Sequence, residues 1–266
     1  MSRLRPIDAE RRRESGVGPD FSEALARGLQ IIGAFDEAHR QMSLSDVARA
    51  VDLPRATARR ALHTLAHLGY VESDGRLFRL TPKILRLAGA YLTTNPISMI
   101  LQGVCDRITR ATGEPCSAAV LQADEVVMIA RAVPAQVLPV GAGIGFRLPA
   151  YCSALGRVLL AAGSDEAVHG YLDRVELARF TPRTVTDPAL LARAIAVARE
   201  DGYAFVDQEV EHGFRSIAVP LHRFDGAAIG ALNIGAHAER AGEAAMLEEY
   251  LPLLRREAAE LRHQLV

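Results

Sequence analysis

The chain has 266 residues, of which 49% are hydrophobic and 24% are charged, and these values are typical of a globular protein with two domains. No stretch approaches the roughly 18 uninterrupted apolar residues of a membrane span, and the Arg-rich residues 1–20 lack the apolar core of a secretory signal. The cysteines Cys105, Cys116 and Cys152 have no CxxC spacing, which argues against a disulfide framework or a zinc cluster. We therefore expect a cytoplasmic protein with no metal and no cofactor.

Charge is distributed unevenly along the chain, although the net charge is only -1. Residues 1–86 hold 15 Lys and Arg against 11 Asp and Glu, whereas residues 87–266 hold 16 against 21. This asymmetry has the sign expected if only the first part meets a polyanion. Ordinary variation between two domains would give the same difference, so sequence motifs must decide between the two.

Residues 21–82 show the pattern of a small three-helix domain, after a tail over residues 1–20 that we expect to be disordered. Residues 21–37 place Leu25, Gly28, Leu29, Ile32 and Phe35 on one face of an amphipathic first helix. Ser43 and Asp46 have the spacing of a capping box at the start of a short second helix. Pro54 suits the first turn of a third helix, which we expect to end near Leu68.

The third helix has an apolar face and a basic face. In a helix-turn-helix protein the exposed face of such a helix enters the major groove, where arginines reach guanine edges or phosphates. Two strands on either side of residues 73–75 predict a hairpin, or wing, that lies along the phosphate backbone. The predicted DNA contacts are Ser43, Arg55, Ala56, Thr57, Arg59, Arg60, His63, Arg76 and Arg79.

Three runs of the sequence carry a resemblance to a known family. The run LPRATARRALHTLAHLGYVESDGRLFRLTPKILRLAGAYL resembles IclR-family bacterial regulators, in particular the branch that controls aromatic acid catabolism in response to protocatechuate or 4-hydroxybenzoate. The runs LPAYCSALGRVLLA and GYAFVDQEVEHGFRSIAVPL extend the resemblance over nearly the whole chain beyond the tail. The resemblance implies a winged helix-turn-helix domain, a GAF-like effector domain, and regulation of aromatic catabolism genes by a small aromatic acid.

A linker helix is expected over residues 83–95, followed by an effector-binding domain over residues 96–266. Thr81-Pro82 and Asn95-Pro96 each have the cap-and-proline pattern of a helix start. The linker is too apolar for a free rod, so we expect it to pack against a partner chain or the adjoining domain. A homodimer, or a dimer of dimers, would match two winged helices to an inverted-repeat operator in double-stranded DNA.

From Ser117 onward the pattern changes to strands and helices. Strands are expected over residues 117–122, 126–131, 136–140, 203–207, 216–221 and 227–234, and helices over 153–162, 165–172, 187–202 and 243–264, the last kinked at Pro252. This order predicts a mixed sheet flanked by helices, and so an α+β multidomain fold for the chain, with a GAF-like α/β effector domain at its C-terminal end. Such a sheet can hold a small molecule among polar loops.

Two connections in the second domain are suited to an organic anion. Residues 141–149 form a glycine-containing loop before a helix whose N-terminal amides and dipole favour negative charge. Arg147 in this loop is the first candidate for an aromatic carboxylate. The family resemblance implies further pocket residues: Tyr151, Ser153, Ala154, Leu155, Arg215, Ser216 and Asn233. Structural roles remain open, since Arg215 could pair with Glu209 or Glu211, and Ser153 could be only a helix cap.

An enzyme and a protein-interaction module are the alternatives. The glycine loop spells GxGxG, but Phe146 stands three positions after Gly143, so the dinucleotide fingerprint fails. Ser153 lacks the flanking glycines of a nucleophile elbow. Cys152 could be an activated thiolate at a helix N-terminus, although a buried core cysteine is commoner. An interaction module would show no salt-dependent DNA binding.

Overall fold

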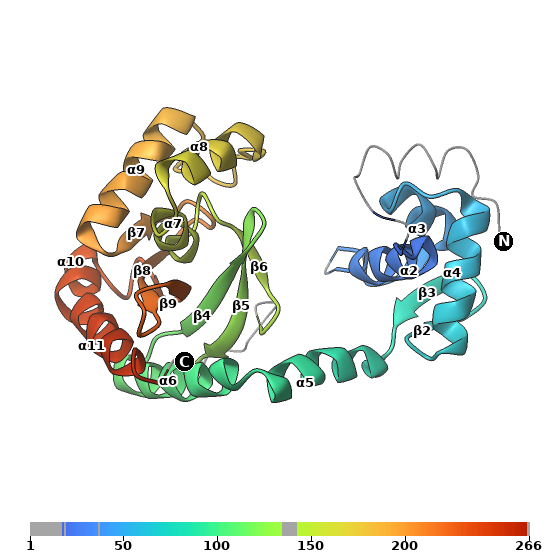
Figure 1. Ribbon diagram of the computed structural model, residues 1–266, viewed down its shortest axis with the longest axis horizontal. Helices are drawn as coiled ribbons and strands as arrows, with labels where there is room; N and C mark the ends of the chain where they lie inside the picture. Colours follow the sequence, from blue (N-terminus) through green and yellow to red (C-terminus); the bar gives the residue numbers. More distant parts are fainter. Residues whose placement is uncertain (1–17, 19, 37, 135–142, 265–266) are drawn as a thin grey trace. The chain divides into compact units, whose positions relative to one another are not determined.

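The structure is a computed structural model that describes residues 18, 20–36, 38–134 and 143–264 (Figure 1). The chain divides into two compact units, Met1–Tyr91 and Leu92–Val266. Nearly all of the expected tail and the whole strand expected over residues 136–140 lie outside the described residues. Among the described helices, none is both long enough and apolar enough to cross a membrane.

Up to Leu80, the described part of the first unit contains three helices and a small antiparallel sheet. The helices are α2 (Glu23–Gly33), α3 (Leu44–Ala50) and α4 (Arg55–His67). The strands β1 (Met42–Ser43), β2 (Val71–Ser73) and β3 (Leu77–Leu80) pair in the order β1-β3-β2. The predicted helices and wing are therefore present, with ends that differ by a few residues, as is common where helices fray.

Local signals account for the helix ends in this unit. Ser43 Oγ accepts a hydrogen bond from Asp46 N at 3.3 Å, and Asp46 Oδ2 accepts one from Ser43 N at 3.1 Å, which confirms the capping box. Pro54 precedes α4, where its missing N–H costs nothing. Gly69 follows α4 with φ of 77°, a left-handed conformation that glycine adopts without strain.

The expected apolar face of α2 is buried only in part. Ile31 is fully buried in the core of the unit, and Ile32 and Phe35 pack against it. Leu25 and Leu29 are instead 64% and 56% exposed. The helix turns only its C-terminal half toward the core, so two of the five predicted core-facing residues form a separate apolar surface.

Two helices connect the units in sequence. A 3-10 turn over Pro82–Ile84 leads into α5 (Leu85–Thr94), and α6 (Pro96–Thr112) follows directly. Thr81 and Asn95 cap these segments through their side chains, as predicted, and Gly113 ends α6 with φ of 70°. None of the described residues of α5 is buried, whereas α6 buries one face.

The second unit is built on a six-stranded sheet with the order β6-β5-β4-β9-β8-β7. Its strands are β4 (Cys116–Gln122), β5 (Glu125–Ala132), β6 (Arg147–Pro149), β7 (Ala204–Asp207), β8 (Phe214–His222) and β9 (Ala228–His237). The prediction of a mixed sheet is wrong, because every described strand pair is antiparallel. Short turns join β4 to β5 and β8 to β9, and such turns allow only antiparallel neighbours.

Helices cover both faces of this sheet (Figure 1). The helices α7 (Ala154–Ala161), α8 (Asp165–Arg174) and α9 (Pro188–Asp201) share one apolar core with the sheet, and α7 is buried along its whole length. On the other face, α6 and the C-terminal helices form a second core. The first face, which we call the α7 face, contains most of the predicted effector residues.

The C-terminal helix expected over residues 243–264 is divided into three parts. These are α10 (Glu243–Ala245), a π-helical turn over Met246–Tyr250, and α11 (Leu251–Leu261). Pro252 lies in the first turn of α11, directly after the π turn. Proline lacks an N–H and its ring clashes with the preceding helical turn, and the wider π turn accommodates both effects.

Candidate nucleic-acid interface and ligand site

The outer side of α4 carries the expected basic residues. Arg55, Arg59 and Arg60 are exposed, and no described carboxylate forms an ion pair with them. Ala56 and His63 are exposed beside them. Unpaired guanidinium groups on one face of a helix provide the positive potential and the donors that a DNA backbone and guanine edges require.

The wing presents two further arginines. Asp74 Oδ1 accepts hydrogen bonds from Arg76 N and Leu77 N at 2.8 Å, and these bonds stabilise the hairpin turn and lower the pKa of Asp74. Arg76 is exposed, whereas Arg79 Nε lies 2.6 Å from Glu72 Oε1 on the neighbouring strand. An exposed pair of this kind contributes at most about 1 kcal/mol, so a phosphate can replace the Glu72 carboxylate.

The structure places two predicted DNA contacts away from the exposed surface of α4. Thr57 is only 8% exposed and faces the interior, contrary to the expected outward position. The Ser43 hydroxyl donates to Asp46 Oδ2 at 2.6 Å and caps α3. Helix geometry explains the first difference, because Thr57 lies four residues before Ala61 and eight before Leu65 and so shares their inward face.

In the second unit, the structure does not bring the two predicted arginines to the α7 face. Arg147 is 43% exposed on β6, with Nε 2.6 Å from Glu125 Oε2 and Nη1 2.8 Å from Gln122 Oε1. Its neighbour Leu148 packs against the core of the α7 face, so strand alternation turns Arg147 the other way. The segment expected as a flexible loop thus ends in an edge strand that fixes this side chain.

Arg215 is held on the opposite side of β8. Its Nε donates to Asp207 Oδ1 at 3.0 Å and its Nη1 donates to Ala241 O at 3.2 Å, which leaves the side chain 13% exposed. The expected alternative partners Glu209 and Glu211 are therefore replaced by Asp207. Arg215 alternates with Ser216, and only Ser216 points to the α7 face.

Four polar side chains form a row across four neighbouring strands on the α7 face. Asn233 on β9 donates through Nδ2 to Ser216 Oγ on β8 at 2.8 Å and accepts through Oδ1 from Ser117 N on β4 at 3.1 Å. Ser117 Oγ accepts in turn from Arg131 Nη1 on β5 at 3.0 Å. We call these four residues, Ser117, Arg131, Ser216 and Asn233, the polar row.

Arg131 has a free hydrogen-bonding donor in this row. No described carboxylate forms an ion pair with it, and its Nε is buried without a hydrogen-bond partner. Its remaining side-chain contact is a weak one, from Nη1 to Met128 Sδ at 3.5 Å. Burial lowers the pKa of the guanidinium, but an arginine stays protonated in proteins. A half-buried, unpaired cation with an unsatisfied N–H is an unstable arrangement that an anion would correct.

The start of α7 supplies apolar and main-chain groups on the same face. Ser153 Oγ accepts from Gly156 N at 3.1 Å, so this serine is a helix cap in the structure. Ala154 and Leu155 are buried, and their amides belong to the first helical turn, which has no intrahelical acceptor. Tyr151 is also buried, and its hydroxyl donates to Ala178 O at 2.6 Å.

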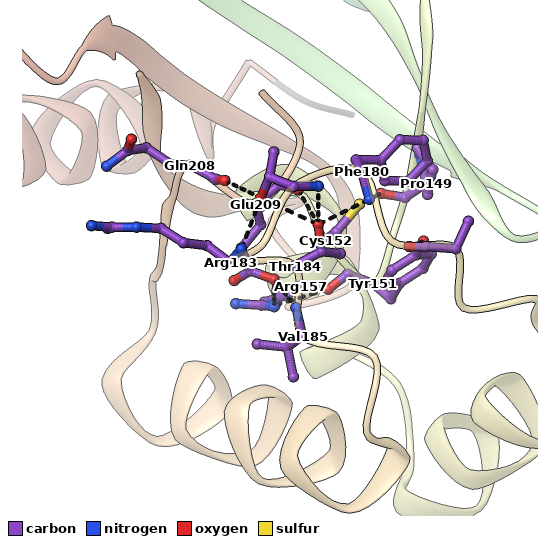
Figure 2. Close-up of polar contacts among 12 residues, drawn as sticks. Pro149, Tyr151, Cys152, Arg157, Phe180, Arg183, Thr184, Val185, Gln208 and Glu209 are labelled. Atoms are coloured by element: carbon purple, nitrogen blue, oxygen red, sulfur yellow. Dashed lines mark hydrogen bonds and ion pairs between the residues drawn. The ribbon is translucent and has the colours of Figure 1, made fainter. Parts of the chain in front are cut away.

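A buried ion pair holds the start of α7 in place (Figure 2). Arg157 Nη2 donates to Glu209 Oε2 at 2.7 Å, and Arg157 Nε donates to Tyr151 O at 2.9 Å. The same Glu209 oxygen accepts from Val185 N at 3.0 Å, and Glu209 O accepts from Thr184 Oγ1 at 2.6 Å. Neither side chain has a fully buried polar atom without a hydrogen-bond partner, which is the condition under which a buried ion pair is tolerated.

The residues weighed for catalysis have structural surroundings. Cys152 is fully buried, and desolvation raises the pKa of its thiol to about 12. Its Sγ donates a weak hydrogen bond to Pro149 O at 3.9 Å. Within the described residues, no group of three His, Cys, Asp or Glu side chains is placed to hold a metal ion.

Arg131 and Ser117 are not among the residues that the sequence pattern predicts for the site. One signal was present, because Arg131 is the one charged residue inside the apolar run VVMIARAV. An arginine in a strand of this kind is rarely buried unless it has a partner. Ser117 gives no comparable signal, since a serine at the start of a strand is common.

A winged helix-turn-helix unit with a basic outer face, joined by a helix to an α/β unit, is the architecture of a DNA-binding transcription regulator. The family model of the IclR helix-turn-helix domain matches residues 24–75, and that of the bacterial transcriptional regulator IclR C-terminal domain matches residues 89–263. The chain therefore belongs to the IclR family of bacterial transcription regulators. It has the fold of that family and functions as an IclR-type regulator.

Three individual relatives show which members of the family this chain is similar to. A Pca regulon regulatory protein of Pseudomonas putida is 41% identical over 93% of this chain and 85% of its own length. A double mutant of the inducer binding domain of the PobR transcription factor from Acinetobacter, in complex with 3-hydroxybenzoic acid, covers 63% of this chain and 98% of its own length, at 32% identity and a TM-score of 0.60. An IclR homolog of Microbacterium hydrocarbonoxydans in complex with 4-hydroxybenzoate covers 90% of this chain and 98% of its own length, at 27% identity and a TM-score of 0.74. These relatives are transcription regulators or parts of regulators.

Proposed function

We propose that this IclR-type regulator changes its affinity for DNA when it binds a hydroxylated aromatic carboxylate of the 4-hydroxybenzoate or protocatechuate class. The observation that carries the proposal is Arg131, a half-buried guanidinium with an unpartnered Nε on the α7 face. A carboxylate satisfies both the charge and the N–H, and charge-assisted bonds of this kind are among the strongest in proteins. The complexes of two relatives with hydroxybenzoates support the ligand class.

The polar row also suits a second polar group on the ligand. Arg131 and Asn233 lie on strands two positions apart, and neighbouring strands are about 4.8 Å apart. This separation suits an aromatic ring with a carboxylate at one end and a hydroxyl at the other. Asn233 and Ser216 would bind the hydroxyl, while buried apolar residues such as Leu155 would contact the ring. Arg131 thereby takes the role expected for Arg147.

On the DNA side, we propose that α4 binds the major groove through Arg55, Arg59 and Arg60, with Arg76 at the backbone. Two copies would bind an inverted repeat, as a homodimer or a dimer of dimers. The exposed Leu25 of α2 supports such an assembly, because a leucine on an apolar surface favours contact with another chain. A regulator of chromosomal genes acts in the cytoplasm, and we assign no catalytic role to the second unit.

The experiment that tests the ligand proposal is a thermal-shift screen of hydroxybenzoates on three forms of the full chain. A ligand at 100 times its Kd stabilises the folded state by about 2.7 kcal/mol and so raises the Tm. We expect this shift with the wild type and with Arg147→Met, and its loss with Arg131→Met. A wild type that responds to no hydroxybenzoate, or a shift that depends on Arg147 and not on Arg131, would refute the proposal.

A further inference from the structure

The side chain of Gln102 on α6 binds the main chain of Arg131 on β5 from both sides. Gln102 Oε1 accepts from Arg131 N at 3.1 Å, and Gln102 Nε2 donates to Arg131 O at 2.9 Å. Gln102 Nε2 also donates to Asp106 Oδ1 at 2.9 Å. Both Nε2 partners are acceptors and the Oε1 partner is a donor, so only this orientation of the amide satisfies all three contacts.

This contact occupies a place beside β5 that no described strand takes. The ladder between β6 and β5 covers residues 125–127, and the main chain of Met128 also bonds to Phe146 O and Gly145 N, so among the described residues the outward main-chain groups of Arg131 have no strand neighbour. A primary amide offers one donor and one acceptor side by side, as a neighbouring strand residue does. Gln102 therefore joins α6 to the strand position from which Arg131 enters the polar row.

Residue 131 thus faces two partners at once. Its side chain lies on the α7 face with a free Nε, and its main chain is bound by α6 on the edge of the sheet. In the sequence α6 begins at Pro96, two residues after α5 ends, and α5 contains the boundary with the DNA-binding unit at Tyr91 and Leu92. Gln102 is therefore placed between the ligand-binding strand and the segment that leads to the DNA-binding unit.

A second observation concerns unsatisfied groups. Among the described residues, the buried side-chain atoms without a hydrogen-bond partner are Arg131 Nε and Ser98 Oγ. Ser98 precedes Gln102 by four residues on α6 and so lies on the same face of the helix. The two elements that Gln102 joins each contain a buried polar group that gains a partner only if something moves or binds.

We infer that Gln102 is a positioning residue for the allosteric response: it transmits the binding of an anion at Arg131 to α6. This inference rests on the proposed function and states how ligand binding at the same site affects the DNA-binding unit. When the Arg131 guanidinium turns from Ser117 to a bound carboxylate, its main chain moves with it, and the two bonds to Gln102 carry that displacement to α6. Coupling then depends on Gln102, although Gln102 makes no contact with the ligand.

The test separates ligand binding from coupling in the full chain. Gln102→Met keeps the length of the side chain but removes both bonds to Arg131, and Gln122→Met is a matched control on the exposed end of β4. For each protein, 4-hydroxybenzoate binding is measured by calorimetry, and binding to the DNA fragment that the wild type protects is measured by fluorescence anisotropy with and without the acid. By linkage, the DNA must change the affinity for the acid by the same factor as the acid changes the affinity for DNA.

We expect Gln102→Met to keep acid binding and acid-free DNA binding within about threefold of the wild type, while the coupling factor falls from the usual range of about 5–150 toward 1. Gln122→Met should retain the wild-type factor. If Gln102→Met is unstable, Gln102→Glu replaces it: it keeps the acceptor for Arg131 N and loses the Nε2 donations to Arg131 O and Asp106 Oδ1, and its coupling factor should fall as well.

The outcomes are distinguishable. A wild-type coupling factor in a folded Gln102 variant overturns the inference and leaves the proposed function intact. A parallel loss of acid affinity in Gln102→Met also overturns it, since Gln102 would then only support the ligand site. Failure of the wild type to bind any hydroxybenzoate overturns the proposed function first, and the inference with it.

Discussion

Three arginines of the second unit differ in what surrounds their guanidinium groups. Arg147 and Arg215 each have a carboxylate partner in the folded chain, Glu125 and Asp207 respectively. Arg131 has a serine hydroxyl and a thioether, and one buried N–H without a partner. A guanidinium that is already paired gains little from a ligand carboxylate, whereas an unpaired one gains the full interaction. This difference is why the ligand site is assigned to Arg131.

The arginines on the outer side of α4 should determine operator affinity. We expect Arg59→Ala and Arg60→Ala each to weaken specific binding by about 1–3 kcal/mol, the value for a bidentate base contact. Arg110→Ala, an exposed arginine of the second unit, is the control and should leave DNA binding unchanged. Anisotropy titrations at several salt concentrations check this, because a purely phosphate contact would instead lower the salt slope by about 1 and weaken all sequences equally. Unchanged binding in both α4 variants would contradict the interface.

The Cys152 thiol should be unreactive in the folded protein. Burial raises its pKa to about 12, so the thiol stays protonated throughout the physiological range and becomes a thiolate only as the pH rises toward 12. We expect no alkylation of Cys152 by iodoacetamide at about pH 8 in buffer, and complete alkylation in denaturant. Site-resolved mass spectrometry is the measurement. Rapid modification of the folded protein would revive a catalytic role for this residue.

At the scale of elements, α7 depends on one glycine. A Cβ at Gly156 would lie 2.2 Å from Ala150 O, so the helix approaches the preceding segment more closely than any other residue permits. We expect Gly156→Ala to destabilise the second unit by at least about 1–3 kcal/mol, because the backbone on both sides must shift. The measurement is urea unfolding, in which a lower midpoint at constant slope reports the loss.

Gly170 on α8 provides the matched control. A Cβ there meets no atom within 4 Å, and the position is exposed within a helix. Gly170→Ala should therefore stabilise the protein by about 0.5–1 kcal/mol through the lower entropy of the unfolded chain. Equal effects of the two substitutions would mean that the contact with Ala150 does not matter.

Most elements could be predicted from the sequence because their ends depend on neighbouring residues. The capping box of Ser43 and Asp46, the start at Pro96 and the end at Gly202 are all set within a few positions of the chain. The strand β6 could not be predicted, because three residues form a strand only when β5 is available to pair with them. The mixed sheet was likewise wrong, since the pairing of β4 with β9 joins segments that are distant in sequence, whereas the hairpin of the wing depends on a short turn.

At the scale of the whole molecule, the division into two units predicts separable functions. A fragment over residues 92–266 contains the polar row, α6 and both cores of the second unit. Both cores are formed by residues of the second unit alone, which favours independent folding. We expect the fragment to bind 4-hydroxybenzoate within about threefold of the full chain and to lose operator binding. Calorimetry and anisotropy on the same preparation check both, and a fragment that does not fold or bind would show that the units depend on one another.

The sequence by itself determined the order of helices, the wing, the basic face of α4 and the resemblance to IclR regulators. Each of these features depends on residues that are close together in the chain. Only the tertiary structure decided which polar groups are paired. Arg131 differs from Arg147 through Ser117 and Met128 on one side and Glu125 on the other, and those contacts exist only after the sheet has formed. Burial and pairing depend on a residue's neighbours in space, and the proposed ligand site at Arg131 rests on both.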